Sequence, residues 1–146
     1  MNIYFICTGN TCRSPMAEAI LKAKKLDDFE VRSAGIFAMP GGEISENAKV
    51  VLSEANIFTE HVSKQIEAED LEWANLILTM TSAHKEMILQ AFPSISDKTF
   101  TLKEYIAPYG SYDVSDPFGG DVHLYRQTFQ ELNKLIDALE TKLSEG

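Results

Sequence analysis

Two cysteines and an arginine lie close together near the start of the chain, in the stretch CTGNTCRSP. Five residues separate Cys7 from Arg13, and Ser14 follows directly. A loop of this length between a strand and a helix can turn its backbone N–H groups inward around one tetrahedral oxyanion. Arg13 adds a planar set of donors that matches two oxygens of a phosphoryl group. The spacing therefore predicts a phosphate-binding loop that carries a thiol.

Cys7 is the candidate nucleophile of this loop. A thiolate at a helix N-terminus beside an arginine can titrate at ~3.5–7.5 instead of ~8.5, so we expect a lowered pKa for Cys7 and attack at neutral pH. Ser14 is expected to donate a hydrogen bond to the sulfur. Gly9 allows a positive φ angle and a close approach of the backbone, and Asn10 is a residue type that tolerates the left-handed conformation.

A cysteine-dependent phosphatase also needs a proton donor for its leaving group and a base for the water that follows. One carboxylate on a loop can do both, and Asp116 in SDPFGG is the candidate, with Asp113 as the alternative. Pro117 stiffens this loop, Gly119 and Gly120 end it, and Phe118 is expected at the mouth of the pocket.

Other uses of these residues fail on spacing. No Gly-Lys pair is present for a Walker A loop, and the loop has one glycine where a dinucleotide fingerprint needs three. Zinc needs about four ligands, whereas Cys7 and Cys12 have no second cluster beside them and the histidines are scattered at positions 61, 84 and 123. We expect no metal, and we expect the histidines to be surface or helix-capping residues.

Composition restricts the setting. The chain has 146 residues, and we expect one domain over 1–146. Its net charge of −9 disfavours nucleic acid and anionic membranes as partners. No signal peptide and no membrane-spanning apolar run is visible, so we expect a cytoplasmic protein with reduced thiols.

Strand and helix patterns alternate along the chain. We expect strands at 2–7, 29–36, 75–80 and 98–102, and helices at 14–25, 46–55, 67–74, 82–91 and 122–143, with a loop over 107–120. Ser14 and Ser45 are predicted helix caps. In the last helix, the apolar residues expected to face the core of the protein include Leu124 and Leu132.

This alternation predicts an α/β fold, a three-layer domain with a parallel sheet and helices on both faces. Ligands of such sheets bind beyond the carboxyl ends of the strands. The first strand ends at Cys7, so the phosphate-binding loop after the first strand lies where a site is expected.

The loop from Cys7 to Pro15, Ser33-Ala34-Gly35 and Asp116-Pro117 together resemble the low-molecular-weight protein tyrosine phosphatase family. The resemblance covers nearly the whole chain. It implies a four-stranded parallel sheet, no metal or other cofactor, and a phosphocysteine intermediate. It makes the catalytic residues Cys7, Arg13 and Asp116.

The resemblance also implies supporting roles. Ser33 would bond to Asn10, and Cys12 would be a reversible disulfide partner of Cys7 that protects an oxidised nucleophile. The residues expected to bind substrate are Thr8, Gly9, Asn10, Thr11, Cys12, Ser14 and Phe118.

Thr11 separates branches of that family. Tyrosine-directed members usually have an aliphatic residue there, whereas Thr11 resembles the bacterial protein-arginine phosphatase branch, and Phe118 points the same way. A hydroxyl suits the polar guanidinium of phosphoarginine. We therefore expect a protein-arginine phosphatase acting on phosphorylated proteins, with a protein-tyrosine phosphatase as the alternative.

Two alternative functions are disfavoured, and the oligomeric state and further pocket walls complete the expectations. An arsenate reductase would need cysteines outside the loop, and the chain has two cysteines in all. A redox switch built on Cys7 and Cys12 is the non-enzymatic alternative, which the presence of Asp116 disfavours. We expect a monomer, with Phe37 and Tyr112 as further walls of the pocket.

Overall fold

A computed structural model describes residues 1–107 and 110–145, so positions 108–109 of the predicted loop lie outside the described residues. The centre of the fold is a parallel sheet with the strand order β2-β1-β3-β4. Its strands are β1 (Asn2–Cys7), β2 (Glu30–Gly35), β3 (Leu76–Thr79) and β4 (Thr99–Thr101). The predicted four-stranded parallel sheet is confirmed.

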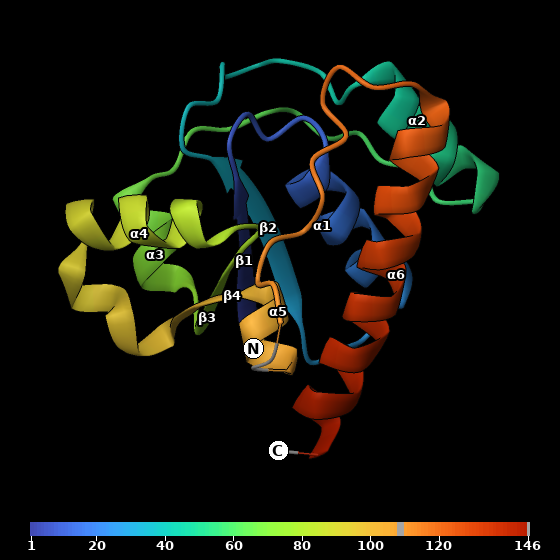
Figure 1. The fold of residues 1–146 in the computed structure, drawn as a ribbon. Coiled ribbons are helices and arrows are strands. Elements are labelled where there is room, and N and C mark those ends of the chain that lie inside the picture. Colours follow the sequence, from blue (N-terminus) through green and yellow to red (C-terminus); the bar gives the residue numbers. More distant parts are fainter. Residues whose placement is uncertain (108–109, 146) are drawn as a thin grey trace.

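Helices cover both faces of this sheet, as predicted (Figure 1). One layer contains α1 (Arg13–Ala23), α2 (Glu46–Glu54) and α6 (Val122–Glu145), and the other contains α3 (Ala68–Trp73) and α4 (Ser82–Ala91). The 3₁₀ helix η1 (Pro93–Lys98) and the short helix α5 (Leu102–Ile106) flank β4. Among the described helices, none is long and apolar enough to cross a membrane.

Strand β1 shows why the sheet needs two helical layers. Its side chains alternate between the faces: Ile3, Phe5 and Cys7 pack with the α1 and α6 layer, whereas Tyr4 and Ile6 pack with the α3 and α4 layer. All five are buried. The strand is therefore a continuous apolar run. Its alternation places the side chain of Cys7, the last residue of β1, on the face of the sheet that α1 covers.

The first helix begins one residue earlier than predicted. Cys12 occupies the N-cap position of α1 without a side-chain cap, and the helix starts at Arg13. Ser14 is not the cap, because its hydroxyl is hydrogen-bonded inside the loop. The helix ends before the predicted Lys25, which has a left-handed φ of 53°. Ser45 does cap α2, accepting from the N–H of Ala48.

Two predictions near the C-terminus need correction. Leu124 is exposed, and the buried residue of that turn is Tyr125; Leu132, by contrast, is buried as predicted. Helix α5 was not predicted, although Thr101 and Glu104 form a capping box, a pattern that is visible in sequence.

Candidate active site

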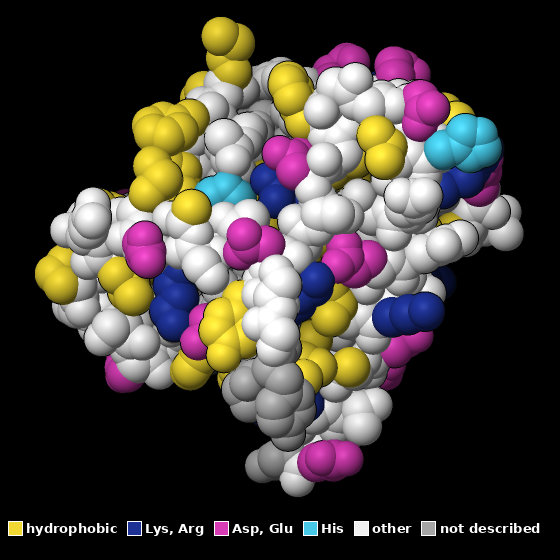
Figure 2. Space-filling view, viewed as in Figure 1, with side chains coloured by type: hydrophobic (Ala, Val, Ile, Leu, Met, Phe, Trp, Pro, Cys, Tyr) yellow, Lys and Arg dark blue, Asp and Glu magenta, His cyan; other side chains and the backbone are white. Residues whose placement is uncertain are grey.

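The loop between β1 and α1 lies at the carboxyl end of the sheet and forms one wall of a pocket of about 280 Å³. Figure 2 shows a basic, an acidic and a histidine side chain together near the top of the same face, with exposed hydrophobic side chains beside them. The residues that line the pocket are Cys7, Thr8, Gly9, Thr11, Cys12, Arg13, Asp116 and Phe118. Eight predicted site residues thus share one cavity.

Asn10 holds the loop in shape from behind. Its φ of 56° is left-handed, as its residue type allows. Its Oδ1 accepts from the N–H of Lys64 at 2.9 Å, so the amide nitrogen must be the donor to its two hydroxyl partners. These are Ser14 Oγ and Ser33 Oγ, both at 2.9 Å. The predicted contact between Ser33 and Asn10 is present.

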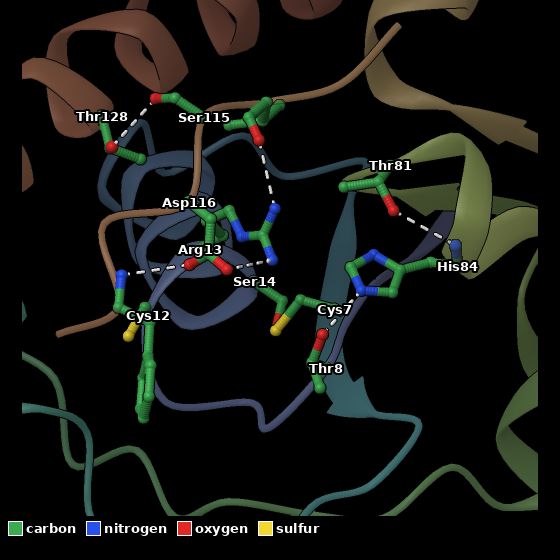
Figure 3. Close-up of polar contacts among 12 residues, drawn as sticks. Cys7, Thr8, Cys12, Arg13, Ser14, Thr81, His84, Ser115, Asp116 and Thr128 are labelled. Carbon is green, nitrogen blue, oxygen red and sulfur yellow. Dashed lines mark hydrogen bonds and ion pairs between the residues drawn. The ribbon is translucent and has the colours of Figure 1, made fainter.

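The direction of the bond at the sulfur follows from this arrangement. Ser14 Oγ lies 2.8 Å from Cys7 Sγ (Figure 3). Since the Ser14 oxygen already accepts from Asn10, its one hydrogen is free for the sulfur. When Cys7 is a thiolate, Ser14 is the donor, because the ionised sulfur carries no hydrogen.

Burial opposes ionisation of this thiol. Cys7 is buried, and burial raises the pKa of its thiol above the ordinary value. The Ser14 hydroxyl, the backbone N–H groups of Ser14 and Asn10, and the Arg13 guanidinium lower that pKa, but they do not outweigh burial. The expectation of a lowered pKa was wrong because it counted the donors and not the loss of solvent.

Gly9 and Gly35 differ from each other in their roles. Gly9 does not adopt the positive φ that its residue type allows, and Asn10 makes the left-handed turn instead. At Gly35 a Cβ atom would lie 2.4 Å from the carbonyl oxygen of Thr8. A glycine is needed there because the end of β2 packs directly against the phosphate-binding loop.

Arg13 and Asp116 face each other across the pocket (Figure 3). Their side chains approach to 3.5 Å, with Arg13 buried and Asp116 largely exposed. A second Arg13 nitrogen donates to the carbonyl of Val114 at 3.1 Å, which ties the Asp116 loop to the arginine. Asp116 Oδ1 accepts from the N–H of Phe118, whose side chain is exposed at the mouth of the pocket.

Asp113, the alternative acid, lies elsewhere. Its Oδ1 accepts from the N–H of Ser82 at the start of α4, and it does not line the pocket. Phe37 and Tyr112 are likewise absent from the pocket lining, so the prediction that they are pocket walls was wrong. Phe37 is instead exposed, and its backbone N–H donates to the Thr8 carbonyl.

The second cysteine has a different environment from the first. Cys12 is buried, and its Sγ lies 3.3 Å from the hydroxyl of Tyr125 in α6. Burial and this contact raise the pKa of Tyr125. Both cysteines are free thiols lining the same pocket.

Two histidines at the loop were not expected there. His61 Nε2 lies 2.9 Å from the carbonyl of Asn10, and its Nδ1 lies 3.6 Å from the Glu18 carboxylate. His84 Nε2 lies 2.8 Å from Thr8 Oγ1. Both were predicted to be surface or capping residues, but their contacts are with residues more than forty positions away, which no local pattern reveals.

Glu18 anchors the far side of this network. It accepts from Ser33 and Lys22 and lies beside His61. Burial acts to raise the pKa of Glu18, but the hydrogen bonds from His61, Lys22 and Ser33 outweigh it and lower that pKa. Within the described ranges, no group of three or more His, Cys, Asp or Glu side chains could hold a metal ion.

Residues 2–146 match the family described as low molecular weight phosphotyrosine protein phosphatase. The chain belongs to this family. It is 51% identical over 141 residues to a protein-arginine-phosphatase of Geobacillus stearothermophilus, covering 97% of this chain and 95% of that protein. It is 43% identical over 141 residues to the low molecular weight protein-tyrosine-phosphatase PtpB of Staphylococcus haemolyticus, covering 97% of this chain and 99% of that protein.

One similar solved structure has a phosphoryl group on a residue of its active site. A C7S mutant of YwlE arginine phosphatase, with a phosphorylated active-site serine, matches with a TM-score of 0.94 and 45% identity. The match covers 99% of this chain and 96% of that one. The family therefore includes relatives named for phosphoarginine and relatives named for phosphotyrosine, and both are similar to this chain over nearly its full length.

Proposed function

We propose that the protein hydrolyses phosphoarginine in proteins through a phosphocysteine intermediate on Cys7. The observation that carries the choice of substrate is Thr11, which lines the pocket together with Cys7 and Cys12. Its Oγ1 lies 3.6 Å from Cys12 Sγ, and its carbonyl accepts from the N–H of Ser45. Thr11 thus lines the cavity with its hydroxyl beside the Cys12 sulfur and its carbonyl bound to α2's cap residue.

A hydroxyl in this wall distinguishes the two leaving groups. Phosphoarginine carries N–H donors directly beside the phosphoryl group, and an unpaired donor in a closed pocket is costly. Thr11 offers an acceptor to such a donor, whereas the edge of a tyrosine ring has none to give. The 51% identity to a relative named protein-arginine-phosphatase supports the same substrate.

In the first chemical step the Cys7 thiolate attacks phosphorus while the Arg13 guanidinium holds two phosphoryl oxygens. The P–N bond breaks with its electron pair on nitrogen, and Asp116 gives its proton to that nitrogen, so that arginine leaves as a guanidinium cation. Asp116 fits this role because it is the carboxylate that lines the pocket.

In the second step Asp116, now ionised, accepts a proton from water as the water oxygen attacks phosphorus. The P–S bond breaks and phosphate is released. The sulfur leaves as a thiolate, which the Ser14 hydrogen bond stabilises. The phosphorylated serine in the C7S relative supports residue 7 as the position that carries the phosphoryl group.

Hydrolysis of phosphotyrosine is the second candidate. The exposed Phe118 ring at the pocket mouth offers an aromatic surface to a tyrosine ring, and a relative at 43% identity is named a protein-tyrosine-phosphatase. Paired kinetics decide between them: phosphate release is measured from two peptides of one sequence, one with phosphoarginine and one with phosphotyrosine. We expect a much higher kcat/KM for the phosphoarginine peptide, and comparable values would contradict the proposal.

A further inference from the structure

His84 is buried directly under the phosphate-binding loop and has no part in the reaction steps above. It belongs to the first turn of α4, and its backbone N–H donates to the capping hydroxyl of Thr81 at 3.1 Å. Its side chain extends from α4 toward the loop, where Nε2 meets Thr8 Oγ1 at 2.8 Å (Figure 3). Since Thr8 lines the pocket, the ring connects α4 to the pocket wall.

The ring is uncharged at neutral pH. Burial lowers the pKa of His84 to about 4, and the positive charge of Arg13 acts in the same direction. Asp113 and Asp116 are the charged groups that oppose this lowering. One ring nitrogen therefore carries a hydrogen, and the other has a free lone pair and can only accept a hydrogen bond.

The unpartnered nitrogen indicates which is which. His84 Nδ1 is buried and has no hydrogen-bond partner among the described residues. A hydrogen on Nδ1 would leave a buried N–H without an acceptor, in a region that the charge of Arg13 makes unfavourable for positive groups. A hydrogen on Nε2 leaves only a bare lone pair unpaired, which the same charge stabilises.

With the hydrogen on Nε2, His84 donates to Thr8 and does not use the hydroxyl hydrogen of Thr8. We propose that His84 is a positioning residue that fixes Thr8 Oγ1 in the pocket wall with its hydroxyl hydrogen free for a phosphoryl oxygen of the substrate. The second lone pair of the Thr8 oxygen can accept from the guanidinium of the phosphoarginine substrate. This inference rests on the proposed function, because it gives Thr8, like Thr11, a role in binding the guanidinium of phosphoarginine.

A double-mutant cycle tests the coupling. His84→Leu, Thr8→Val and the double variant are compared with the natural chain by kcat/KM on a phosphoarginine peptide. Each single change removes one oriented hydrogen bond and is expected to lower kcat/KM about tenfold, mainly through KM. Because both changes remove the same arrangement, the double variant should be no worse than either single one. Additive losses would overturn the proposal.

A conservative variant separates positioning from packing. His84→Gln can place an amide N–H near the position of Nε2, so it is expected to retain most of the activity that His84→Leu loses. Equal losses in the two variants would show that the ring acts only by filling space. The phosphotyrosine peptide provides the second readout: its kcat/KM should fall less than that of the phosphoarginine peptide in both His84→Leu and Thr8→Val.

The natural chain gives an independent answer if His84→Leu does not fold. Nitrogen-15 NMR of the histidine ring distinguishes the tautomers, and we expect hydrogen on Nε2 and none on Nδ1 at neutral pH. Hydrogen on Nδ1 would overturn the proposal. A preference of the natural chain for phosphotyrosine would contradict the proposed function, whereas the tautomer and the cycle would still decide the role of His84.

Discussion

Ser14 Oγ lies 2.8 Å from Cys7 Sγ and can donate its hydrogen to the sulfur while its oxygen accepts from the amide of Asn10. This single contact joins the loop that shapes the pocket to the atom proposed to attack phosphorus. It acts against burial, which raises the pKa of the Cys7 thiol. The balance between these two influences sets how much thiolate is present.

Ser14→Ala should therefore raise the pKa of Cys7 further and slow turnover. A hydrogen bond to a charged group contributes about 1.5–3 kcal/mol, so kcat is expected to fall about tenfold to a hundredfold. The pH dependence of Cys7 alkylation by iodoacetamide measures the pKa directly. Ser33→Ala is the matched control, since Ser33 binds the same amide of Asn10 but not the sulfur. An unchanged alkylation profile in Ser14→Ala would refute this role.

Asp116→Asn should slow the chemistry and leave phosphate binding intact. Loss of a general acid costs about 10²–10⁴-fold in rate, while the neutral amide removes a negative charge 3.5 Å from Arg13. Inorganic phosphate, measured as a competitive inhibitor, should bind at least as tightly as before. Asp113→Asn is the control, because Asp113 accepts from the N–H of Ser82 and does not line the pocket. Full activity in Asp116→Asn would require another proton donor.

His84 should make stability depend on pH. Its pKa is about 4 in the folded chain, against an ordinary value of 6.5. Between these values the unfolded chain binds the extra proton, so the free energy of unfolding rises with pH across this window and is level above it. His84→Gln cannot titrate and should lack about 2 kcal/mol of this rise, after allowance for partial solvation. Urea unfolding at several pH values measures it, and parallel curves for the two proteins would exclude the effect.

Cys12 should protect the nucleophile from permanent oxidation. If peroxide converts Cys7 to a sulfenic acid, Cys12 in the same pocket can displace water and form a disulfide that a thiol reductant reopens. Cys12→Ser should stay active but fail to recover after peroxide treatment. Tyr125→Phe, which removes only the hydroxyl beside Cys12, should recover like the natural chain. Equal recovery in Cys12→Ser would rule out the protective role.

Local patterns predicted the parts of the fold that are local. The apolar run of β1, the cap at Ser45 and the left-handed Asn10 each depend on a few neighbouring residues. The prediction that Leu124 faces the core was wrong, because the packing of α6 against α1 and α2 decides which side of its first turn is buried.

The site was predicted where one segment supplies it and missed where distant segments meet. The loop from Cys7 to Ser14 and the Asp116 segment were visible as motifs. His61 and His84 reach the loop from other elements, and residue type alone does not reveal such contacts. The pKa of Cys7 was missed for a similar reason, since burial is a property of the whole fold.

The most direct test of the account is the ratio of kcat/KM for matched phosphoarginine and phosphotyrosine peptides, measured for the natural chain and for Thr11→Ile. Ile keeps the branch at Cβ of Thr11 and replaces its hydroxyl with an ethyl group, so the wall becomes apolar and one carbon larger. The account predicts a ratio strongly in favour of phosphoarginine that reverses in Thr11→Ile. A ratio near one in the natural chain, or one that Thr11→Ile leaves unchanged, would contradict it.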